Sequence, residues 1–296
     1  MTDLTTNYPI SIVERDTGIS RDTLRVWERR YGFPLPARND KGERIYSEQQ
    51  LRTLQRVRRL MDQGLRPGKL LPPDQAKFEQ IENSLGQSPS STSPDINPDI
   101  INIISAVEEA RPERISGILQ TQYAQLGMKE FVLQFVLPLV IQVGERWARG
   151  QLEIYQEHVI TDHLLRFLTR ECDQLAIDDS KPTVLLATLP GENHTLGLTM
   201  IAALLAEQGM RSINLGSSVP MDQLARAATD FKCSIVGITF SGAYPYHAIR
   251  ATVTELRELL ADDVRIYIGG EGVRRLRKLP DGVFKILSLT HIHEIS

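Results

Sequence analysis

Short apolar runs alternate with helical patterns over residues 181–296, and this alternation constrains the fold more than any other feature of the sequence. The runs are TVLLATL, RSINLG, CSIVGITF and VRIYIGG, and the first is followed by small residues and then by the helical pattern LGLTMIAALLAEQG. Strands that alternate with helices predict a parallel, doubly wound α/β sheet. Ligands of such sheets bind beside the carboxyl ends of the strands. The small residues expected there are Gly191, Ser217, Ser218, Ser241, Gly242, Gly269 and Gly270, although each alone can simply mark a turn.

Two other kinds of segment precede this region, so the chain is predicted to be multi-domain. The runs IINIISAVEEA, RISGILQTQYAQLG, MKEFVLQFVLPLVIQVGERWA and YQEHVITDHLLRFLTREC carry apolar residues at helical spacing. Four such helices predict a four-helix bundle. The stretch SLGQSPSSTSPDINP holds five Ser and three Pro and predicts a flexible linker. The expected segments are 1–76, a linker at 77–98, a bundle at 99–178 and the sheet domain at 181–296.

The charge of the chain is divided unevenly between its two ends. Residues 1–70 hold 14 Lys and Arg against 9 Asp and Glu, whereas the remaining residues hold 20 against 28. A basic excess confined to one end suggests that this end binds a polyanion, with a chance excess on a solvated helix as the alternative. We find no signal peptide, no apolar stretch of membrane-spanning length, and only Cys172 and Cys233. These features predict a cytoplasmic protein without a membrane partner, a disulfide framework or a thiolate metal site.

A helix-turn-helix pattern occupies the basic end. An apolar helix is followed by the Thr17-Gly18 break, and Ser20 can cap a second helix. On that helix Arg21, Arg25 and Glu28 share one face, which can enter a major groove. Next come Arg38, the turn residues Asn39, Asp40 and Gly42, and ERIYSEQQL, which together predict a hairpin-like wing.

The motifs TLRVWERRYG at 23–32 and RIYSEQQL at 44–51 make residues 9 to about 70 resemble the winged-helix head of MerR-family regulators. The resemblance implies binding to double-stranded operator DNA. By similarity, Arg25, Trp27, Arg44 and Tyr46 match positions that contact the DNA backbone or orient the head, and Arg21 and Arg38 are expected additions. For Trp27, packing in the core is an equally good alternative.

The loop after the first predicted strand carries Glu192, His194 and Gly197 in the order ExHxxG. A neutral imidazole nitrogen can bind a metal such as cobalt, while a carboxylate bonded to the other ring nitrogen fixes its orientation. The glycine leaves room for a bulky macrocycle to approach the backbone. Taken alone the motif is weak, because a histidine in an exposed loop is more often simply solvated.

The order of the later motifs resembles the cobalamin-binding fold, which is flavodoxin-like and has the pattern DxHxxG, then SxL, then GG. Here Ser241-Gly242-Ala243 and Gly269-Gly270 follow the histidine loop, with Glu192 in place of Asp and Ala243 in place of Leu. The resemblance implies cobalamin, as adenosylcobalamin or methylcobalamin, with His194 as the lower axial ligand of cobalt. It also implies that Ser241, Gly269 and Gly270 contact the nucleotide tail, with Gly242 beside them.

The bundle contains Trp147, then nine residues, then Glu157-His158. This Wx9EH pattern resembles the light-responsive, adenosylcobalamin-dependent regulators of the CarH and LitR type, in which these residues lie at the upper corrin face. Core packing is the alternative for Trp147 alone. In light-reactive members a histidine follows the tryptophan, whereas here Ala148 does. Because an alanine side chain cannot coordinate cobalt, a two-histidine photoproduct is not expected through this position. His158 or another group can take its place, so a response to light stays an open alternative.

These observations lead to a hypothesis of a regulator, and not an enzyme, that binds operator DNA as a homo-oligomer, either dimer or tetramer, and represses in response to cobalamin. The alternative is a regulator whose C-terminal part works without cobalamin as an oligomerisation or protein-interaction module. A cobalamin enzyme such as a methyltransferase component is a third possibility. It would need a substrate domain that this sequence does not contain.

Overall fold

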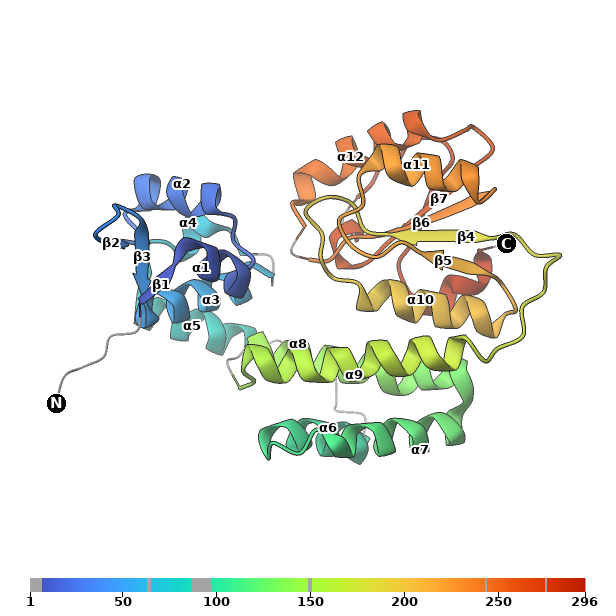
Figure 1. Cartoon of the computed structure of the whole chain (residues 1–296), viewed down its shortest axis with the longest axis horizontal. Helices are drawn as coiled ribbons and strands as arrows, with labels where there is room; N and C mark the ends of the chain where they lie inside the picture. Colours follow the sequence, from blue (N-terminus) through green and yellow to red (C-terminus); the bar gives the residue numbers. More distant parts are fainter. Residues whose placement is uncertain are drawn as a thin grey trace. The chain divides into compact units, whose positions relative to one another are not determined.

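The computed structural model describes residues 7–62, 65–86, 97–148, 151–242, 244–274 and 276–295. They form two compact units, one of Met1–Pro94 with Arg146–Gln151 and the other of Asp95–Glu145 with Leu152–Ser296. Each unit has a hydrophobic core of its own. Figure 1 shows the elements of each unit in sequence colours.

The first unit combines helices with a small antiparallel sheet of order β1-β3-β2. Its core contains Val13, Leu24, Trp27, Tyr46 and Leu54. The elements are β1 (Asn7–Pro9), α1 (Ile10–Thr17), α2 (Arg21–Tyr31), β2 (Ala37–Arg38), β3 (Arg44–Ser47), α3 (Glu48–Asp62), α4 (Pro67–Leu70) and α5 (Gln75–Gly86).

The helical part of the second unit precedes its sheet. It consists of α6 (Pro98–Glu108), α7 (Glu113–Glu130), the π-helix η1 (Phe131–Val136), α8 (Leu137–Ala148) and α9 (Ile154–Cys172). Helices α6, α7 and α9 contact one another. Gly127 interrupts α7 with φ 69° and ψ 169°, a backbone conformation that glycine adopts most readily. Helices therefore lie where the sequence predicts them, whereas their action as one four-helix bundle stays a prediction.

The helical run Glu113–Trp147 is long and apolar enough to cross a membrane by length and composition alone. Its apolar side chains nevertheless fill the core of the unit. Phe131, Val132, Phe135 and Val136 are all fully buried, and the ring of Phe131 packs against Phe167 of α9 with centroids 5.4 Å apart. Core helices of globular proteins have this composition.

The sheet of the second unit has five parallel strands in the order β5-β4-β6-β7-β8, the doubly wound arrangement that the sequence predicts. Because β5 and β6 lie on opposite sides of β4, the strand order reverses there, and ligands of doubly wound sheets bind beside such a reversal. The elements are β4 (Val184–Ala187), α10 (Leu196–Glu207), β5 (Ser212–Asn214), α11 (Met221–Asp230), β6 (Ile235–Thr239), α12 (Tyr246–Leu259), β7 (Arg265–Gly269), η2 (Glu271–Val273), β8 (Val283–Ile286) and η3 (Leu289–Glu294).

Helix α10 lies between the sheet and the helical part, whereas α11 and α12 cover the other face of the sheet (Figure 1). In α10 no residue from Leu196 to Ala206 is exposed, and Leu198, Ala203 and Leu205 are fully buried. A helix that is apolar on all sides is expected to be buried on all sides. The helical part and the sheet therefore share this one helix.

The sequence placed one boundary wrongly and missed one strand. The predicted linker at 77–98 begins too early, because α5 continues to Gly86, where Phe78 is buried on the first core. Residues 87–96 lie outside the described residues. The edge strand β8 was not predicted, because its four residues VFKI include Lys285 and present only Val283 and Ile286 as buried positions.

Candidate functional site

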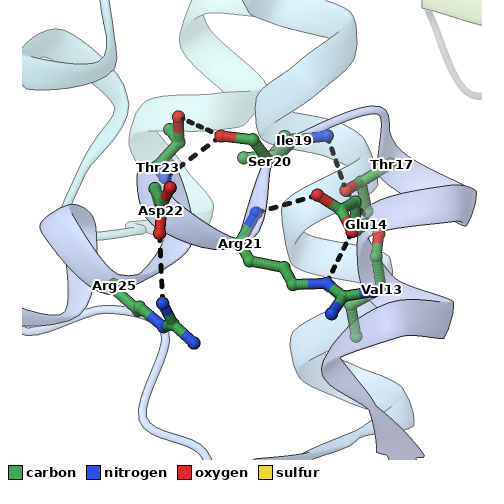
Figure 2. A network of polar contacts seen from close by, with 9 residues as sticks. All are labelled: Val13, Glu14, Thr17, Ile19, Ser20, Arg21, Asp22, Thr23 and Arg25. Carbon is green, nitrogen blue, oxygen red and sulfur yellow. Dashed lines mark hydrogen bonds and ion pairs between the residues drawn. The ribbon is translucent and has the colours of Figure 1, made fainter.

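The turn between α1 and α2 is fixed by short-range hydrogen bonds, which Figure 2 shows. Thr17 Oγ1 donates to the Val13 carbonyl oxygen at 2.6 Å and accepts from the Ile19 amide at 3.2 Å. Gly18 ends α1 with φ 65°, and Ser20 caps α2 by accepting from the Thr23 amide. The predicted helix-turn-helix is therefore formed.

Four predicted DNA-binding arginines are each held by a neighbour. Arg21 Nε lies 2.7 Å from Glu14 Oε2, Arg25 Nη1 lies 3.1 Å from Asp22 Oδ1, and Arg44 Nε lies 2.8 Å from Glu28 Oε2. Arg38 Nη1 donates to the Gly42 carbonyl in the loop of the β2–β3 hairpin, at 2.7 Å. Arg21, Arg25 and Arg38 are exposed, whereas Arg44 is half-buried. These cations are therefore arranged before any ligand binds.

Trp27 and Tyr46 do not lie at the surface as side chains that contact DNA would. Their exposed fractions are 4% and 0%, and both belong to the core of the first unit. Burial also raises the pKa of Tyr46. Their burial favours, of the two predicted roles, orientation of the head through core packing over direct contact with DNA.

The loop after β4 places Glu192 under His194. Glu192 Oε1 lies 2.5 Å from His194 Nδ1 and accepts from the His194 amide at 3.0 Å. Glu192 Oε2 accepts from the Ser241 amide at 2.7 Å. The Glu192 side chain is 2% exposed and that of His194 is 61% exposed. A buried carboxylate thus orients an exposed imidazole and joins the loops that follow β4 and β6.

The hydrogen bonds to Glu192 keep it ionised. Burial raises the pKa of this carboxyl, but the hydrogen bonds from His194 and Ser241 outweigh burial and lower the pKa to about 2. Thr188 supports the same loop, because its hydroxyl donates to the Glu192 carbonyl at 2.6 Å and accepts from the Ser218 amide at 3.0 Å. A carboxylate bonded to one ring nitrogen is common in histidines that bind a metal through the other nitrogen.

Two of the predicted glycines meet different surroundings. Gly270 has φ 94°, and a Cβ there would lie 2.3 Å from the Phe240 carbonyl oxygen, so the loops after β6 and β7 touch through this glycine. At Gly197, in the first turn of α10, a Cβ would only reach Thr239 Cγ2 at 4.0 Å. Gly242 and Gly269 are both half-buried. The tail contacts of these residues stay a prediction, and Ala243 lies outside the described residues.

Thr239 provides a test of whether a cofactor tail fits here. Its hydroxyl is buried at the end of β6, and no described residue forms a hydrogen bond with it. Buried hydroxyl groups normally have partners. The Thr239 methyl carbon Cγ2 is the atom that would lie 4.0 Å from a Cβ at Gly197, so the methyl group and not the hydroxyl borders this glycine. A buried hydroxyl at the carboxyl end of β6, with no partner among the described residues, is a group to which a bound cofactor could supply a hydrogen bond.

The residues of the Wx9EH motif lie on two helices. Trp147 is half-buried near the end of α8, which Ala148 closes. Glu157 and His158 lie in the first half of α9 and contact each other, with Glu157 Oε2 2.5 Å from His158 Nδ1. The His158 side chain is 73% exposed and that of Glu157 is 29% exposed. Their predicted role beside a corrin ring stays a prediction.

Sequence reasoning missed Glu14, Thr188 and Thr239. Nothing in the local sequence singles out Glu14, because its partner Arg21 lies seven residues away across the turn. The contacts of Thr188 and Thr239 join different loops of the sheet. A polar residue at the carboxyl end of an otherwise apolar strand was the available signal for both threonines. Within the described residues, no group of three or more His, Cys, Asp or Glu could hold a metal ion.

Three family models match the chain. Residues 8–70 match the MerR HTH family regulatory protein model. Residues 182–283 match a B12 binding domain model, and residues 99–170 match a second model that is also described as a B12 binding domain. The chain thus combines a MerR-type helix-turn-helix domain with B12-binding domains.

Two curated relatives match the chain over most of their own length. The chain is 28% identical to the HTH-type transcriptional repressor CarH of Myxococcus xanthus over 270 residues, which cover 90% of each protein. It is 27% identical to the HTH-type transcriptional repressor CarA of the same organism, over 90% of this chain and 87% of that one. The Methanosarcina barkeri monomethylamine corrinoid protein shares the fold of its helical and sheet parts, with a TM-score of 0.53 and 13% identity over 67% of this chain and 97% of that chain.

Proposed function

We propose that this protein is a cytoplasmic, cobalamin-responsive transcriptional regulator that represses by binding operator DNA as a homo-oligomer. The observation that carries the proposal is the exposed His194 imidazole, oriented by the buried Glu192 at the carboxyl ends of β4 and β6. The matches to B12 binding domains and the two repressors of similar length support the same proposal. Those relatives are named as repressors, which favours a regulator over an enzyme.

In the proposed complex His194 is the lower axial ligand of cobalt. Glu192 holds the imidazole through Nδ1, and Gly197 leaves space beside α10. Thr239, Ser241, Gly242, Gly269 and Gly270 are proposed to line the tail. Bound cobalamin would supply a cobalt ion that can accept a nitrogen ligand from the protein.

The helices of residues 98–172 are proposed to act as a four-helix cap over the corrin. Trp147 offers an indole for apolar packing against the ring, and Glu157 and His158 offer polar groups for an upper ligand such as adenosyl. Adenosylcobalamin and methylcobalamin both remain candidates. Ala148 cannot take the place of a cobalt-ligating histidine, so the proposal includes no light switch through that position.

The first unit is proposed to bind double-stranded DNA through α2 and the β2–β3 hairpin as wing. Arg25 and Arg38 are proposed to contact phosphates, which would make affinity depend strongly on salt. Arg44, paired with the half-buried Glu28, is proposed to orient the head. Cobalamin changes DNA binding only if it binds one assembly of the protein, dimer or tetramer, better than another. The oligomer is therefore part of the proposed switch.

The test compares the purified full-length protein with and without adenosylcobalamin, in darkness and after illumination. Absorbance reports retained corrinoid, light scattering reports mass, and gel shift reports DNA binding. His194→Ala is expected to lose the axial contact and the change in mass. His291→Ala serves as a matched control, because His291 is exposed on η3 and outside the proposed site. Wild-type protein that retains no corrinoid would contradict the proposal.

A second candidate keeps the DNA-binding head but makes the C-terminal part a cobalamin-independent assembly module. Ala148 after Trp147 and Glu192 in place of Asp favour it. Repression measured in a host that neither makes nor imports cobalamin separates the two. Full repression that does not change when cobalamin is added would support this candidate.

A further inference from the structure

The Glu14 carboxylate accepts two hydrogen bonds from Arg21, the first residue of α2. Its Oε1 accepts a hydrogen bond from the Arg21 amide at 3.1 Å, and its Oε2 accepts from Arg21 Nε at 2.7 Å (Figure 2). The two side chains are 35% and 50% exposed. Because one carboxylate binds both the backbone and the guanidinium, it limits rotation of the Arg21 side chain and fixes the entry to α2.

This contact uses only one edge of the guanidinium. Glu14 binds the guanidinium at Nε, and the Arg21 guanidinium has no other hydrogen-bond partner among the residues that the structure describes. The two Nη groups keep their N–H donors for a ligand. Two parallel donors of arginine match the O6 and N7 acceptors of guanine.

The charge of the pair favours a base over a phosphate. Glu14 and Arg21 together carry no net charge, and a phosphate brought to Arg21 would also approach the Glu14 carboxylate, whose like charge repels it. Guanine O6 and N7 are neutral acceptors and meet no such repulsion. In helix-turn-helix proteins the N-terminal residues of the second helix are those that contact base edges.

We infer that Arg21 reads a guanine in the major groove and that Glu14 is the positioning residue that aims it. This inference rests on the proposed DNA-binding function. Arg21 then supplies sequence choice, with no share in the salt-dependent affinity. Arg25 differs, because its partner Asp22 lies on the same helix and is 88% exposed, so a phosphate can displace that partner easily.

The test selects bound sequences from a library of random duplex DNA with the full chain. Wild-type protein is expected to enrich a guanine at one position of each half-site. Arg21→Ala is expected to reduce discrimination at that position by about 10- to 100-fold. The slope of log affinity against log salt should stay the same, because a neutral pair releases no counterions.

Glu14→Gln should differ from Arg21→Ala in its effect on the salt slope. Glutamine keeps an acceptor for the Arg21 amide but leaves the guanidinium charge uncompensated and less firmly aimed. Guanine preference is expected to weaken, while the salt slope steepens by about one, since one more phosphate can be neutralised. Arg21→Lys keeps the charge but not the paired donors and is expected to lose the preference as Arg21→Ala does.

An exposed ion pair elsewhere in the chain provides the matched control. Arg114 and Glu109 lie 3.1 Å apart, with side chains 50% and 53% exposed, and Arg114→Ala and Glu109→Gln should change neither the preference nor the slope. Melting temperature verifies that each variant folds. Equal weakening on all sequences with a slope reduced by about one in Arg21→Ala would make Arg21 a phosphate contact and overturn the inference. Wild-type protein that enriches no sequence would instead overturn the proposed DNA binding itself.

Discussion

Glu192 and Thr239 are both buried polar residues at the carboxyl end of the sheet, and they differ in how their hydrogen bonds are satisfied. Glu192 accepts from three donors on His194 and Ser241. The Thr239 hydroxyl has no hydrogen-bond partner among the described residues. A buried polar group without a partner lowers stability by about 1–3 kcal/mol. A ligand that supplies the missing partner recovers that free energy on binding.

Thr239→Val tests this difference, because valine has nearly the same shape without the hydroxyl. We expect the cobalamin-free variant to be about 1 kcal/mol more stable than wild type, measured by urea unfolding. Cobalamin retention, measured by absorbance after gel filtration, should decrease. The control Thr121→Val removes the hydroxyl of an exposed residue of α7, which donates to the Gly117 carbonyl, and should not change retention. A less stable Thr239→Val variant that still retains cobalamin fully would contradict the interpretation.

At the scale of elements, the loops after β4, β6 and β7 are joined in series. The loop after β4 binds the loop after β6 through Glu192 and the Ser241 amide. The loop after β7 binds the same segment, because the Gly272 amide donates to the Phe240 carbonyl at 3.0 Å. The position of the His194 imidazole thus depends on the loops after β6 and β7, which lie outside the ExHxxG motif.

Gly270→Ala should disrupt this series of loops. A Cβ would lie 2.3 Å from the Phe240 carbonyl oxygen at φ 94°, a backbone angle that alanine rarely adopts. We expect a loss of about 2–3 kcal/mol in the free energy of unfolding. Gly117→Ala, in α7 with no atom within 4 Å of the added Cβ, should instead gain about 0.5–1 kcal/mol. Equal stability of the two variants in urea unfolding would show that the close approach is not present.

The elements that sequence predicted and those it missed differ in how local their determinants are. The run from Ile235 to Thr239 is buried on both faces and reads as a strand by composition alone. Strand β8 forms by pairing with β7 at the edge of the sheet, which four residues with one Lys do not signal. Helix α5 was missed because its polar composition resembles that of the linker that follows.

The candidate site was predictable where it follows a motif and unpredictable where it depends on folding. Glu192 and His194 are two residues apart, so their pairing could be read from the sequence. The bond from Glu192 to the Ser241 amide spans 49 residues and could not. Burial of Trp27 and Tyr46 likewise depends on how α2 and β3 pack, which no spacing rule reveals.

At the scale of the whole molecule, the basic excess is confined to residues 1–70, and the rest of the chain is acidic. We therefore expect salt to affect the two proposed activities differently. DNA affinity should fall steeply between about 50 and 200 mM salt, as expected for several phosphate contacts. Cobalamin retention should stay nearly constant over the same range, because axial ligation and buried hydrogen bonds are poorly screened. A parallel decrease of both, measured by gel shift and absorbance, would contradict this division.

Helix α10 begins two residues after His194 and has no exposed residue between Leu196 and Ala206. A helix with one face in solvent can move toward that solvent when a neighbouring residue is displaced. This one has no such side, and the sheet and α9 occupy its surroundings. If His194 binds cobalt as proposed, a shift of the imidazole would reach α9, the helix that carries Glu157 and His158, through α10.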